Sequence, residues 1–248
     1  MITIKSLQEI ELMRQAGRIV ASTLRELAKA VKPGVTTMQL DTLARRHIEK
    51  LNARPAFLGY QGFPASICAS VNEEVVHGIP GPRRLEAGDI ISIDVGAYFK
   101  GYYGDAAATF PVEKVSPLAE RLMKVTKDSL FKGIEKARPG NHLYDISAAV
   151  QAHVESNGFS VVRKYVGHGI GTEMHEEPQV PNFGPPGRGP LLEAGMVLAI
   201  EPMVNTGTWD VKTLDDGWTV ITKDGSLSAH FEHTVAILQD GPEILTSF

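Results

Sequence analysis

The stretch LEAGDIISID, residues 85–94, returns as LEAGMVLAIE at residues 192–201, an offset of 107 residues. Each copy contains an apolar run that ends on a carboxylate, Asp94 in the first copy and Glu201 in the second. A second pair of anchors, KPG at 32–34 and RPG at 138–140, repeats at an offset of 106. Two anchors that agree so closely predict an internal duplication. We therefore expect a single domain over residues 1–248, built from halves at about 6–112 and 116–240.

Both helices and strands are expected between these anchors. Ser6 and Glu9 stand at the spacing of a capping box, and Ser116-Pro117 supplies an N-cap followed by proline in the first turn. The spacing of apolar residues predicts helices at 6–31, 37–51, 116–137 and 143–157. Runs of β-branched and aromatic residues between Gly, Asp and Pro predict strands at 90–95, 102–112, 197–203, 218–222 and 232–238. The fold class is therefore α+β.

The composition excludes several classes of protein. Hydrophobic residues make up 43% of the chain and charged residues 22%, as in ordinary globular proteins. No apolar run approaches the roughly 20 residues that span a bilayer, and the first residues lack the features of a secretory signal. Cys68 is the single cysteine, so no internal disulfide can form. The net charge of −4, without a basic block, argues against reading of nucleic acid. We expect a cytoplasmic protein.

Four carboxylates are expected to converge on one sheet. Asp105 follows Asp94 across the turn-rich stretch 96–101, which suits an antiparallel hairpin, and Glu232 begins the last predicted strand. Like charges that are buried together require multivalent cations or shared protons, and metal is the simpler answer. His168, within GHGIG at 167–171, is the natural nitrogen ligand for such a set. Oxygen-rich ligation with one imidazole suits Mn, Fe, Co or Zn, and a pair of such ions favours hydrolysis. Taken singly, each acid is better explained as a surface residue with an unrelated role, and only the set together with the repeat favours a shared site.

These five residues stand in the strings IDVG (93–96), GHGIG (167–171), EPM (201–203) and EHT (232–234). In this order they resemble the methionine aminopeptidases, above all the short bacterial type I form, and the likeness runs from Ile10 to Thr246. The resemblance implies a pita-bread fold, a pseudo-twofold body in which helices cover a curved antiparallel sheet. It also implies a metal-dependent aminopeptidase that hydrolytically removes the N-terminal methionine from peptides and nascent proteins with a small second residue.

The resemblance further implies a ligand set for two divalent ions (Co, Mn, Fe or Zn). Asp94 would bind one metal, His168 and Glu201 would bind the other, and Asp105 and Glu232 would bridge them. Glu201 would in addition accept a proton during hydrolysis. A monovalent cation is also implied, near the backbone of a set of residues close to the sheet: Asn72, Glu74 and Ser228.

Two further histidines receive catalytic and substrate-binding roles from the resemblance. His77 would contact the substrate near the scissile amide, and His175 would stabilise the tetrahedral oxyanion. The pocket for the methionine side chain would be lined by Tyr60, Phe63, Cys68 and Trp218. The chain departs from the familiar bacterial relatives at Phe57, Phe63, Met174 and His230, where they have Cys, Tyr, Phe and Gln.

Two other readings stay open at this point. A pita-bread peptidase that cleaves before proline would use the same five residues, but such enzymes usually carry a separate preceding domain, and only 93 residues precede Asp94. A non-catalytic binding module of the same fold would show substitutions in the ligand set, and none is seen. We expect a monomer that takes peptide or nascent-chain N-termini beginning with Met. The ribosome is a candidate partner.

Overall fold

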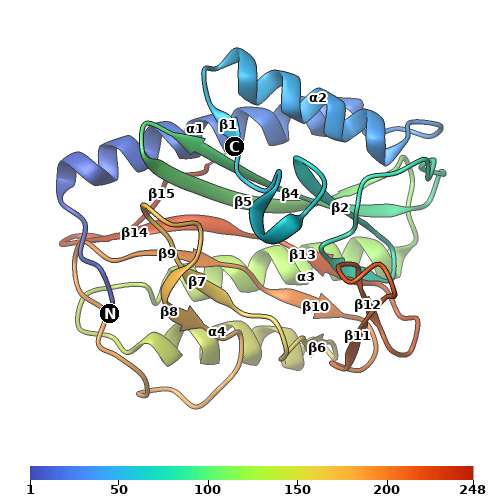
Figure 1. The fold of residues 1–248 in the computed structure, drawn as a ribbon. Helices are drawn as coiled ribbons and strands as arrows, with labels where there is room; N and C mark the ends of the chain where they lie inside the picture. The colour runs from blue at the N-terminus through green and yellow to red at the C-terminus, as the bar shows by residue number, and fades with distance from the viewer. Residues whose placement is uncertain (248) are drawn as a thin grey trace.

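The structure, a computed structural model, describes residues 1–247, and within them the chain forms four α-helices and fifteen β-strands (Figure 1). The helices are α1 (Leu7–Ala30), α2 (Thr37–Lys50), α3 (Pro117–Ile134) and α4 (Leu143–Ser156). All four predicted helices are confirmed. The third ends three residues early, because its last turn tightens into hydrogen bonds from Lys136 N to Gly133 O and from Ala137 N to Ile134 O.

Helix starts follow the capping rules that the sequence obeys. The Ser6 hydroxyl accepts a hydrogen bond from Glu9 N while the Glu9 carboxylate accepts one from Ser6 N, so the predicted capping box is confirmed. A second box, between Thr36 and Gln39, begins α2 and was not predicted. Among the described residues, none of the helices combines the length and the apolar character that a membrane crossing requires.

Two antiparallel sheets form the centre of the molecule. The first contains β1 (Arg54–Pro55), β4 (Ile90–Phe99), β2 (Ile67–Val71) and β5 (Tyr102–Pro111). The second has the order β15 (Gly241–Ile244), β14 (His233–Leu238), β9 (Val197–Ile200), β7 (Gly167–Gly169) and β8 (Glu176–Val180). Two smaller sheets flank them: β13 (Ser228–His230), β10 (Met203–Asn205) and β6 (Ser160–Val161), and β11 (Val211–Thr213), β12 (Val220–Thr222) and β3 (Glu74–Val76).

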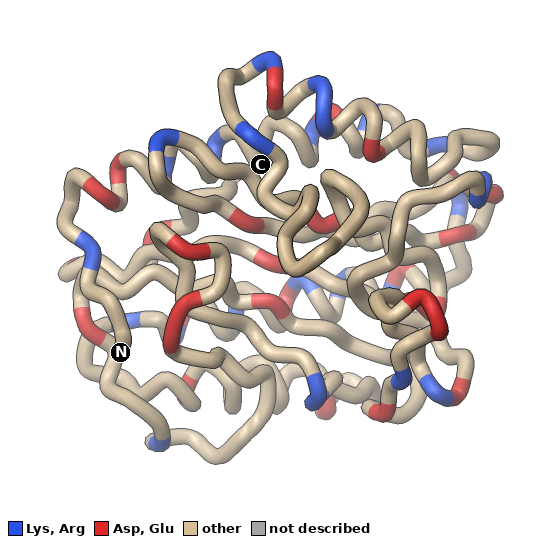
Figure 2. The backbone as a smooth tube through the Cα atoms, in the orientation of Figure 1, with Lys and Arg blue, Asp and Glu red and all other residues tan. Residues whose placement is uncertain are grey.

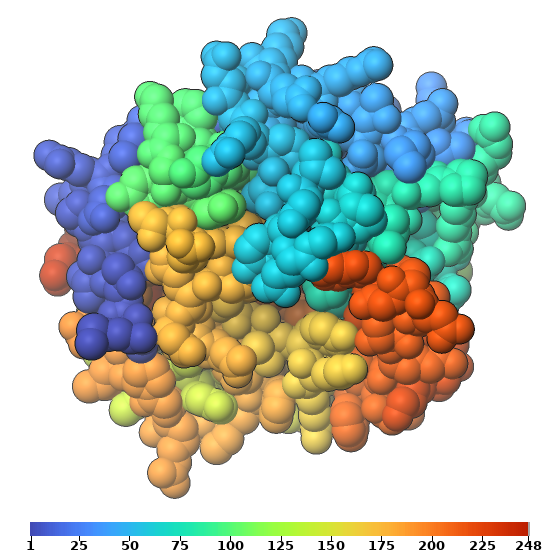
Figure 3. All heavy atoms as spheres, in the orientation of Figure 1, coloured from blue at the N-terminus to red at the C-terminus, as the bar shows by residue number. Residues whose placement is uncertain are grey.

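The helices cover this sheet structure in pairs. α1 and α2 pack on the first sheet through a core that includes Leu24, Leu40 and Ile93, whereas α3 and α4 lie against the strands of the second half (Figure 1). Figure 3 shows the N-terminal residues against the segment around residues 170–195 on the face viewed. The helices and antiparallel sheets confirm the α+β class.

The two halves share matched contacts. Gly34 N donates to Leu85 O at 2.8 Å, and Gly140 N donates to Leu192 O at 3.0 Å. Each Pro-Gly turn is therefore hydrogen-bonded to the first residue of the LEAG segment that follows it in the chain. Both turn glycines have positive φ, 84° and 87°. These contacts are what a duplicated organisation predicts, and the division into halves stays a prediction.

The strands differ from the predicted ones at two informative places. β4 continues through residue 99, and the expected six-residue turn shrinks to Lys100-Gly101, both with positive φ as a tight hairpin requires. The single strand predicted at 197–203 is broken into β9 and β10, because Pro202 has no backbone N–H to continue the ladder. The break leaves Glu201 outside the regular strands.

The two central sheets meet along β5 and β14, and two threonine hydroxyls join β5 to the strands beside it, Thr234 from β14 and Thr109 to β13 of the flanking sheet. The Thr234 hydroxyl donates to Asp105 O at 2.7 Å and accepts from Asp105 N at 3.0 Å. The Thr109 hydroxyl in turn donates to His230 O and accepts from His230 N, both at 2.9 Å. We call this strip, made of Asp105, Thr109, His230 and Thr234, the seam. Each hydroxyl satisfies both backbone groups of a buried residue in the opposite half.

Removal of one seam hydroxyl is expected to destabilise the protein. In Thr234→Val the shape is kept, but Asp105 N and O lose a buried partner, which costs about 1–3 kcal/mol of unfolding free energy. Thr234→Ser, which keeps the hydroxyl, should cost less. The measurement is the urea midpoint, with Thr42→Val as the control because Thr42 bonds Met38 O on an exposed helix face. Equal midpoints for Thr234→Val and the control would contradict the seam's importance.

Candidate metal centre and active site

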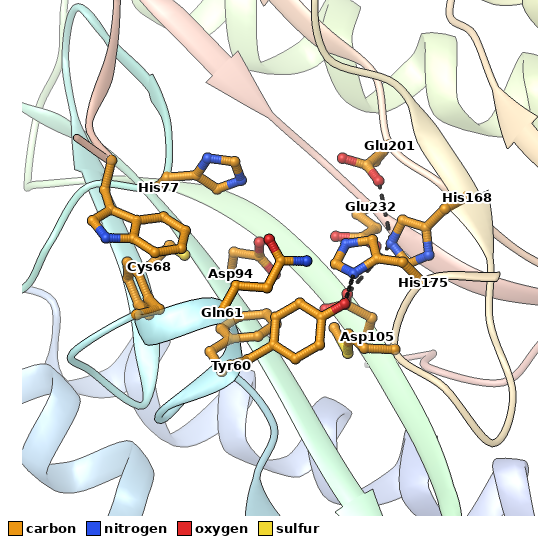
Figure 4. A pocket seen from close by; sticks show the side chains of 14 residues that line it. Tyr60, Gln61, Cys68, His77, Asp94, Asp105, His168, His175, Glu201 and Glu232 are labelled. Carbon is orange, nitrogen blue, oxygen red and sulfur yellow. Dashed lines mark hydrogen bonds and ion pairs between the residues drawn. The ribbon is translucent and has the colours of Figure 1, made fainter. Parts of the chain in front are cut away.

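One cavity of about 230 Å³ collects the candidate site residues (Figure 4). It lies between the two central sheets, and residues of both sheets contribute to its walls. Polar groups form one side, apolar and aromatic groups the other. Its lining consists of Phe57, Tyr60, Gln61, Phe63, Cys68, His77, Asp94, Asp105, His168, Met174, His175, Glu201, Trp218 and Glu232. Every residue that the sequence assigned to catalysis, to the substrate or to the two divalent ions therefore lines this cavity, whereas those of the monovalent site do not.

The β4–β5 hairpin places two of the carboxylates. Asp94 pairs with Ala107 and Asp105 pairs with Gly96, so the two acids lie diagonally on one face of the hairpin, as predicted. Figure 2 shows acidic positions, in red, on the backbone at the centre of the molecule. The other two acids flank the seam: Glu201 follows β9, and Glu232 N donates to Ala107 O at 2.9 Å just before β14.

His168, in β7, completes the cluster. Its Nε2 lies 3.6 Å from Glu201 Oε1 and 3.8 Å from Asp105 Oδ2. Its Nδ1 contacts the Gly169 carbonyl at 2.8 Å, which leaves Nε2 directed at the acids. Side-chain atoms of Asp105, His168 and Glu232 lie within 4.8 Å of one another, a spacing that could hold a metal ion.

Burial raises the pKa of all four acids, and repulsion between carboxylates adds to this for Asp105, Glu201 and Glu232. Burial raises the pKa of Asp94 to about 7, although a hydrogen bond with Asp105 acts against it. The pKa of Asp105 lies well above its usual range, because of burial and then the charges of Glu232 and Asp94. Burial, followed by neighbouring carboxylates, likewise raises the pKa of Glu201 and Glu232. Without a cation, the cluster therefore favours protonated carboxyl groups, and a divalent ion would favour their ionised form.

The histidines around the acids are kept neutral by desolvation. Burial lowers the pKa of His168 to about 3, with a smaller contribution from His175. Desolvation also lowers the pKa of His77, to about 4, and that of His175. A neutral imidazole is the form that binds a metal or donates an N–H without adding charge.

Several buried atoms of the cluster have no hydrogen-bond partner within residues 1–247. These atoms are Asp94 Oδ1, Asp105 Oδ1, Glu232 Oε1 and His230 Nε2. Buried polar groups without partners are rare in native proteins, and charged ones are especially costly. Orphaned oxygens gathered around an imidazole are what a divalent cation would satisfy.

His230 is the residue of this region whose place the sequence underrated. The sequence marks it only as a departure from the bacterial relatives, which have Gln at this position. Its Nε2 lies 3.7 Å from Glu201 Oε2 and 4.0 Å from Glu232 Oε2, and its side chain is buried. Glu201 thus lies between two imidazoles, those of His168 and His230. His233 points elsewhere, toward Thr246 and the Phe131 ring.

The apolar side of the cavity contains the predicted methionine pocket and more. Tyr60, Phe63, Cys68 and Trp218 pack in one cluster, and the Phe63 and Trp218 rings meet edge to face at 5.1 Å. Phe57 and Met174 join the same cluster, and Gln61 also lines the cavity. Gln61 has the left-handed φ of 50°, a signal that single-sequence patterns do not reveal. Burial, followed by the charges of Asp94 and Asp105, raises the pKa of the Cys68 thiol. The thiol therefore stays protonated and lines the cavity without acting as a nucleophile.

His77 and His175 lie at the mouth of the cavity on opposite sides. His77 has φ of 59° and places its ring edge-on to Tyr165 at 5.5 Å. His175 precedes Glu176, whose carboxylate binds buried Lys5 at 2.6 Å and so ties this loop to the N-terminal segment. At the predicted monovalent site, Ser228 N donates to Asn72 O at 2.9 Å, which brings two of the three residues together.

Comparison with known proteins assigns the family. The model of metallopeptidase family M24 matches residues 11–239. A methionine aminopeptidase of Clostridium acetobutylicum is 64% identical over 247 residues and covers 99% of both chains. The crystal structure of a methionine aminopeptidase from Thermotoga maritima has a TM-score of 0.99 and 50% identity, with 100% of each chain covered. The chain belongs to metallopeptidase family M24 and, within it, to the methionine aminopeptidases.

A more distant likeness concerns the fold alone. Prolidase from Pyrococcus furiosus has a TM-score of 0.80 at 21% identity, and the match covers 99% of this chain but 65% of the prolidase. The expected pita-bread fold is confirmed by both groups of structures. Family membership and the buried Asp/His/Glu cluster together indicate that the chain binds divalent metal.

Metal should stabilise the folded chain, and more so as the pH rises. Acids whose folded pKa is raised contribute stability below their unfolded pKa, near 4, and lose it as the pH passes the folded value, about 7 for Asp94. The metal-free protein should therefore lose this contribution between pH 4 and 8, and added Mn²⁺ should restore it. At a free Mn²⁺ concentration of about 100 times Kd, one bound ion raises the free energy of unfolding by about 2.7 kcal/mol. Urea unfolding with and without Mn²⁺ measures the effect.

Two variants make this measurement specific. Asp105→Asn should abolish the Mn²⁺-induced increase in the urea midpoint, whereas Glu193→Gln, at an exposed acid, should keep it. The same increase in both variants would show that the ion binds elsewhere.

Proposed function

We propose that the chain is a divalent-metal-dependent aminopeptidase that hydrolyses the peptide bond after an N-terminal methionine. The observation that carries this proposal is the single cavity in which buried carboxylates and an imidazole face an aromatic, apolar wall. Membership of a metallopeptidase family and the high identity to methionine aminopeptidases over the full chain support the reaction class and the substrate.

The donor set fits two divalent ions. Their proposed ligands would be Asp94 on one side, His168 and Glu201 on the other, and Asp105 and Glu232 between them. The orphaned oxygens of Asp94, Asp105 and Glu232 support this assignment. When bound, such ions would polarise a carbonyl and lower the pKa of a water molecule. The choice among Co, Mn, Fe and Zn, and a monovalent cation at Asn72, Glu74 and Ser228, stay proposals.

The apolar wall would hold the methionine side chain. Tyr60, Phe63, Cys68 and Trp218 present aromatic edges and a protonated thiol, and a thioether makes favourable contacts with aromatic edges. Met174 and Phe57 narrow the same wall. The second residue of the substrate would lie nearer the mouth, between the His77 and His175 rings, where a small side chain fits best.

Each polar residue then has a distinct proposed task. His77 would donate a hydrogen bond near the scissile amide, and His175 would stabilise the oxygen on which negative charge develops. Glu201, whose pKa is raised, would accept a proton and pass it on. Because desolvation keeps both histidines neutral, each would act through an N–H bond and not through a formal charge.

Several wider properties are proposed on the same basis. The substrates would be peptides and nascent chains that begin with Met, with the ribosome as a candidate partner. A cytoplasmic, monomeric, single-domain enzyme agrees with the sequence. The 21% identity to prolidase supports a shared fold only, so cleavage before proline has no specific support here.

The assay of peptide release tests the function directly. The purified chain, loaded anaerobically with Mn²⁺ or Co²⁺, should release methionine from Met-Ala and Met-Gly peptides and leave Met-Leu intact, because a bulky second residue would collide with the mouth. Metal analysis of the same samples gives the ion and its number per chain. If no divalent metal supports methionine release, the proposed enzyme activity is refuted. Faster cleavage of X-Pro peptides than of Met-Ala would favour the prolidase-like alternative.

His175→Ala separates catalysis from metal binding. Loss of a donor to a developing oxyanion lowers kcat by about 100- to 1000-fold, whereas the metal content should stay unchanged because the ligand set is intact. Asp105→Asn is the matched control, in which metal content falls together with activity. A parallel loss of metal in His175→Ala would mean that His175 belongs to the metal site.

A further inference from the structure

Tyr60 makes a hydrogen-bond contact with His175 that its proposed role in lining the methionine pocket does not explain. Its hydroxyl lies 2.7 Å from Nδ1 of His175, and the two rings stack at 5.3 Å with an interplanar angle of 28° (Figure 4). The segments that carry these residues are 115 positions apart in the chain. The contact therefore joins the two sides of the cavity mouth.

A turn of the backbone carries Tyr60. This turn closes on itself, with Gly59 N donating to Phe63 O at 2.9 Å and Phe63 N donating to Tyr60 O at 2.9 Å. Gly59, Gln61 and Gly62 all have left-handed φ, of 82°, 50° and 89°. These left-handed residues, among them the strained Gln61, define the path of the backbone on both sides of Tyr60.

The His175 ring also contacts the ring of His168. The two ring centroids lie 4.2 Å apart, at an angle of 49°. His175 thus contacts both Tyr60 and His168, and a flip of its ring would exchange Nδ1 for a carbon and break the bond to Tyr60. The orientation of the ring is set, and the remaining variable is which nitrogen carries the proton.

The direction of the hydrogen bond follows from basicity. An unprotonated imidazole nitrogen has a lone pair basic enough to titrate near pH 6.5, whereas the oxygen of a neutral phenol is a far weaker base. The phenol is accordingly the donor and Nδ1 the acceptor. With Nδ1 unprotonated, the ring proton resides on Nε2.

We propose that Tyr60 is a positioning residue that donates to Nδ1 of His175 and thereby holds this histidine in the tautomer with its proton on Nε2. The inference rests on the proposed function, because that N–H is the donor the oxyanion would need. It assigns to Tyr60 a second task beside lining the pocket, and the two tasks depend on different atoms. The ring lines the pocket, and the hydroxyl sets the tautomer.

The tautomer can be read without any activity. Long-range ¹H–¹⁵N correlation spectra of the eight histidines distinguish protonated from unprotonated ring nitrogens, and His175→Ala identifies the signals of His175. We expect an unprotonated Nδ1 and a protonated Nε2 in the metal-free and the zinc-loaded wild type, and a mixture of tautomers in Tyr60→Phe. A proton on Nδ1 in the wild type, or unchanged spectra in Tyr60→Phe, would overturn the proposal.

Kinetics then show whether the tautomer matters. Tyr60→Phe keeps the ring, so KM for Met-Ala should stay within twofold, while kcat falls about 3- to 10-fold, the worth of one hydrogen bond. In a His175→Ala background the same change should have no effect on kcat. Tyr103→Phe, which removes the hydroxyl of a tyrosine that does not line the cavity, is the control and should leave both constants unchanged.

The outcomes separate this proposal from the proposed function. A rise in KM with unchanged kcat, or an equal loss in the His175→Ala background, would mean that Tyr60 acts only on the substrate. If the wild type releases no methionine, the proposed function fails, and the spectra still decide the tautomer.

Discussion

Repulsion among four buried carboxylates is the constraint on which the rest of this structure depends. Two like unit charges that lie roughly 4 Å apart repel each other by about 4 kcal/mol at an effective dielectric of 20. A flexible scaffold would relieve that cost by letting the acids move into water. Here the β4–β5 hairpin holds Asp94 and Asp105 in place, and Pro202 ends the regular strand next to Glu201. The hydrogen bond from Glu232 N to Ala107 O, beside the seam, holds Glu232 against β5. The repulsion persists as an affinity for cations.

The same rigidity divides the cavity into a polar and an apolar side. The polar side comes from strands that hydrogen bonds hold in register, whereas much of the apolar side comes from the turn at 57–63 and the segment around Trp218. A change of substrate pocket can therefore occur in loops without disturbing the acids. Phe57, Phe63 and Met174, three of the four positions at which the sequence departs from familiar bacterial relatives, lie on this apolar side, whereas the fourth, His230, lies beside Glu201 and Glu232.

The sequence predicted the helices and the acids well, since both depend on local signals. Capping at Ser6, proline at 117 and the repeated LEAG segments reside in contiguous residues. The seam could not be predicted, because the Thr109 and Thr234 hydroxyls bond residues that lie far away in the chain. A single threonine gives no sequence pattern that would reveal such a distant partner. His230 was underrated for the same reason, as its proximity to Glu201 follows only from the β10–β13 pairing. The hydrogen bond between Tyr60 and His175 likewise depends on left-handed residues that no periodicity reveals.

The position of the acids along the chain also constrains biosynthesis. Asp94 and Glu232 are 138 residues apart, and each half supplies only part of the cluster. At a translation rate of roughly 5–20 residues per second, about 7–28 seconds separate the synthesis of the first acid from that of the last. During that interval the β4–β5 hairpin has neither the seam nor the cavity around it. The enzyme's own nascent chain therefore cannot assemble a working site until nearly all of its sequence has been made, however early its first half folds.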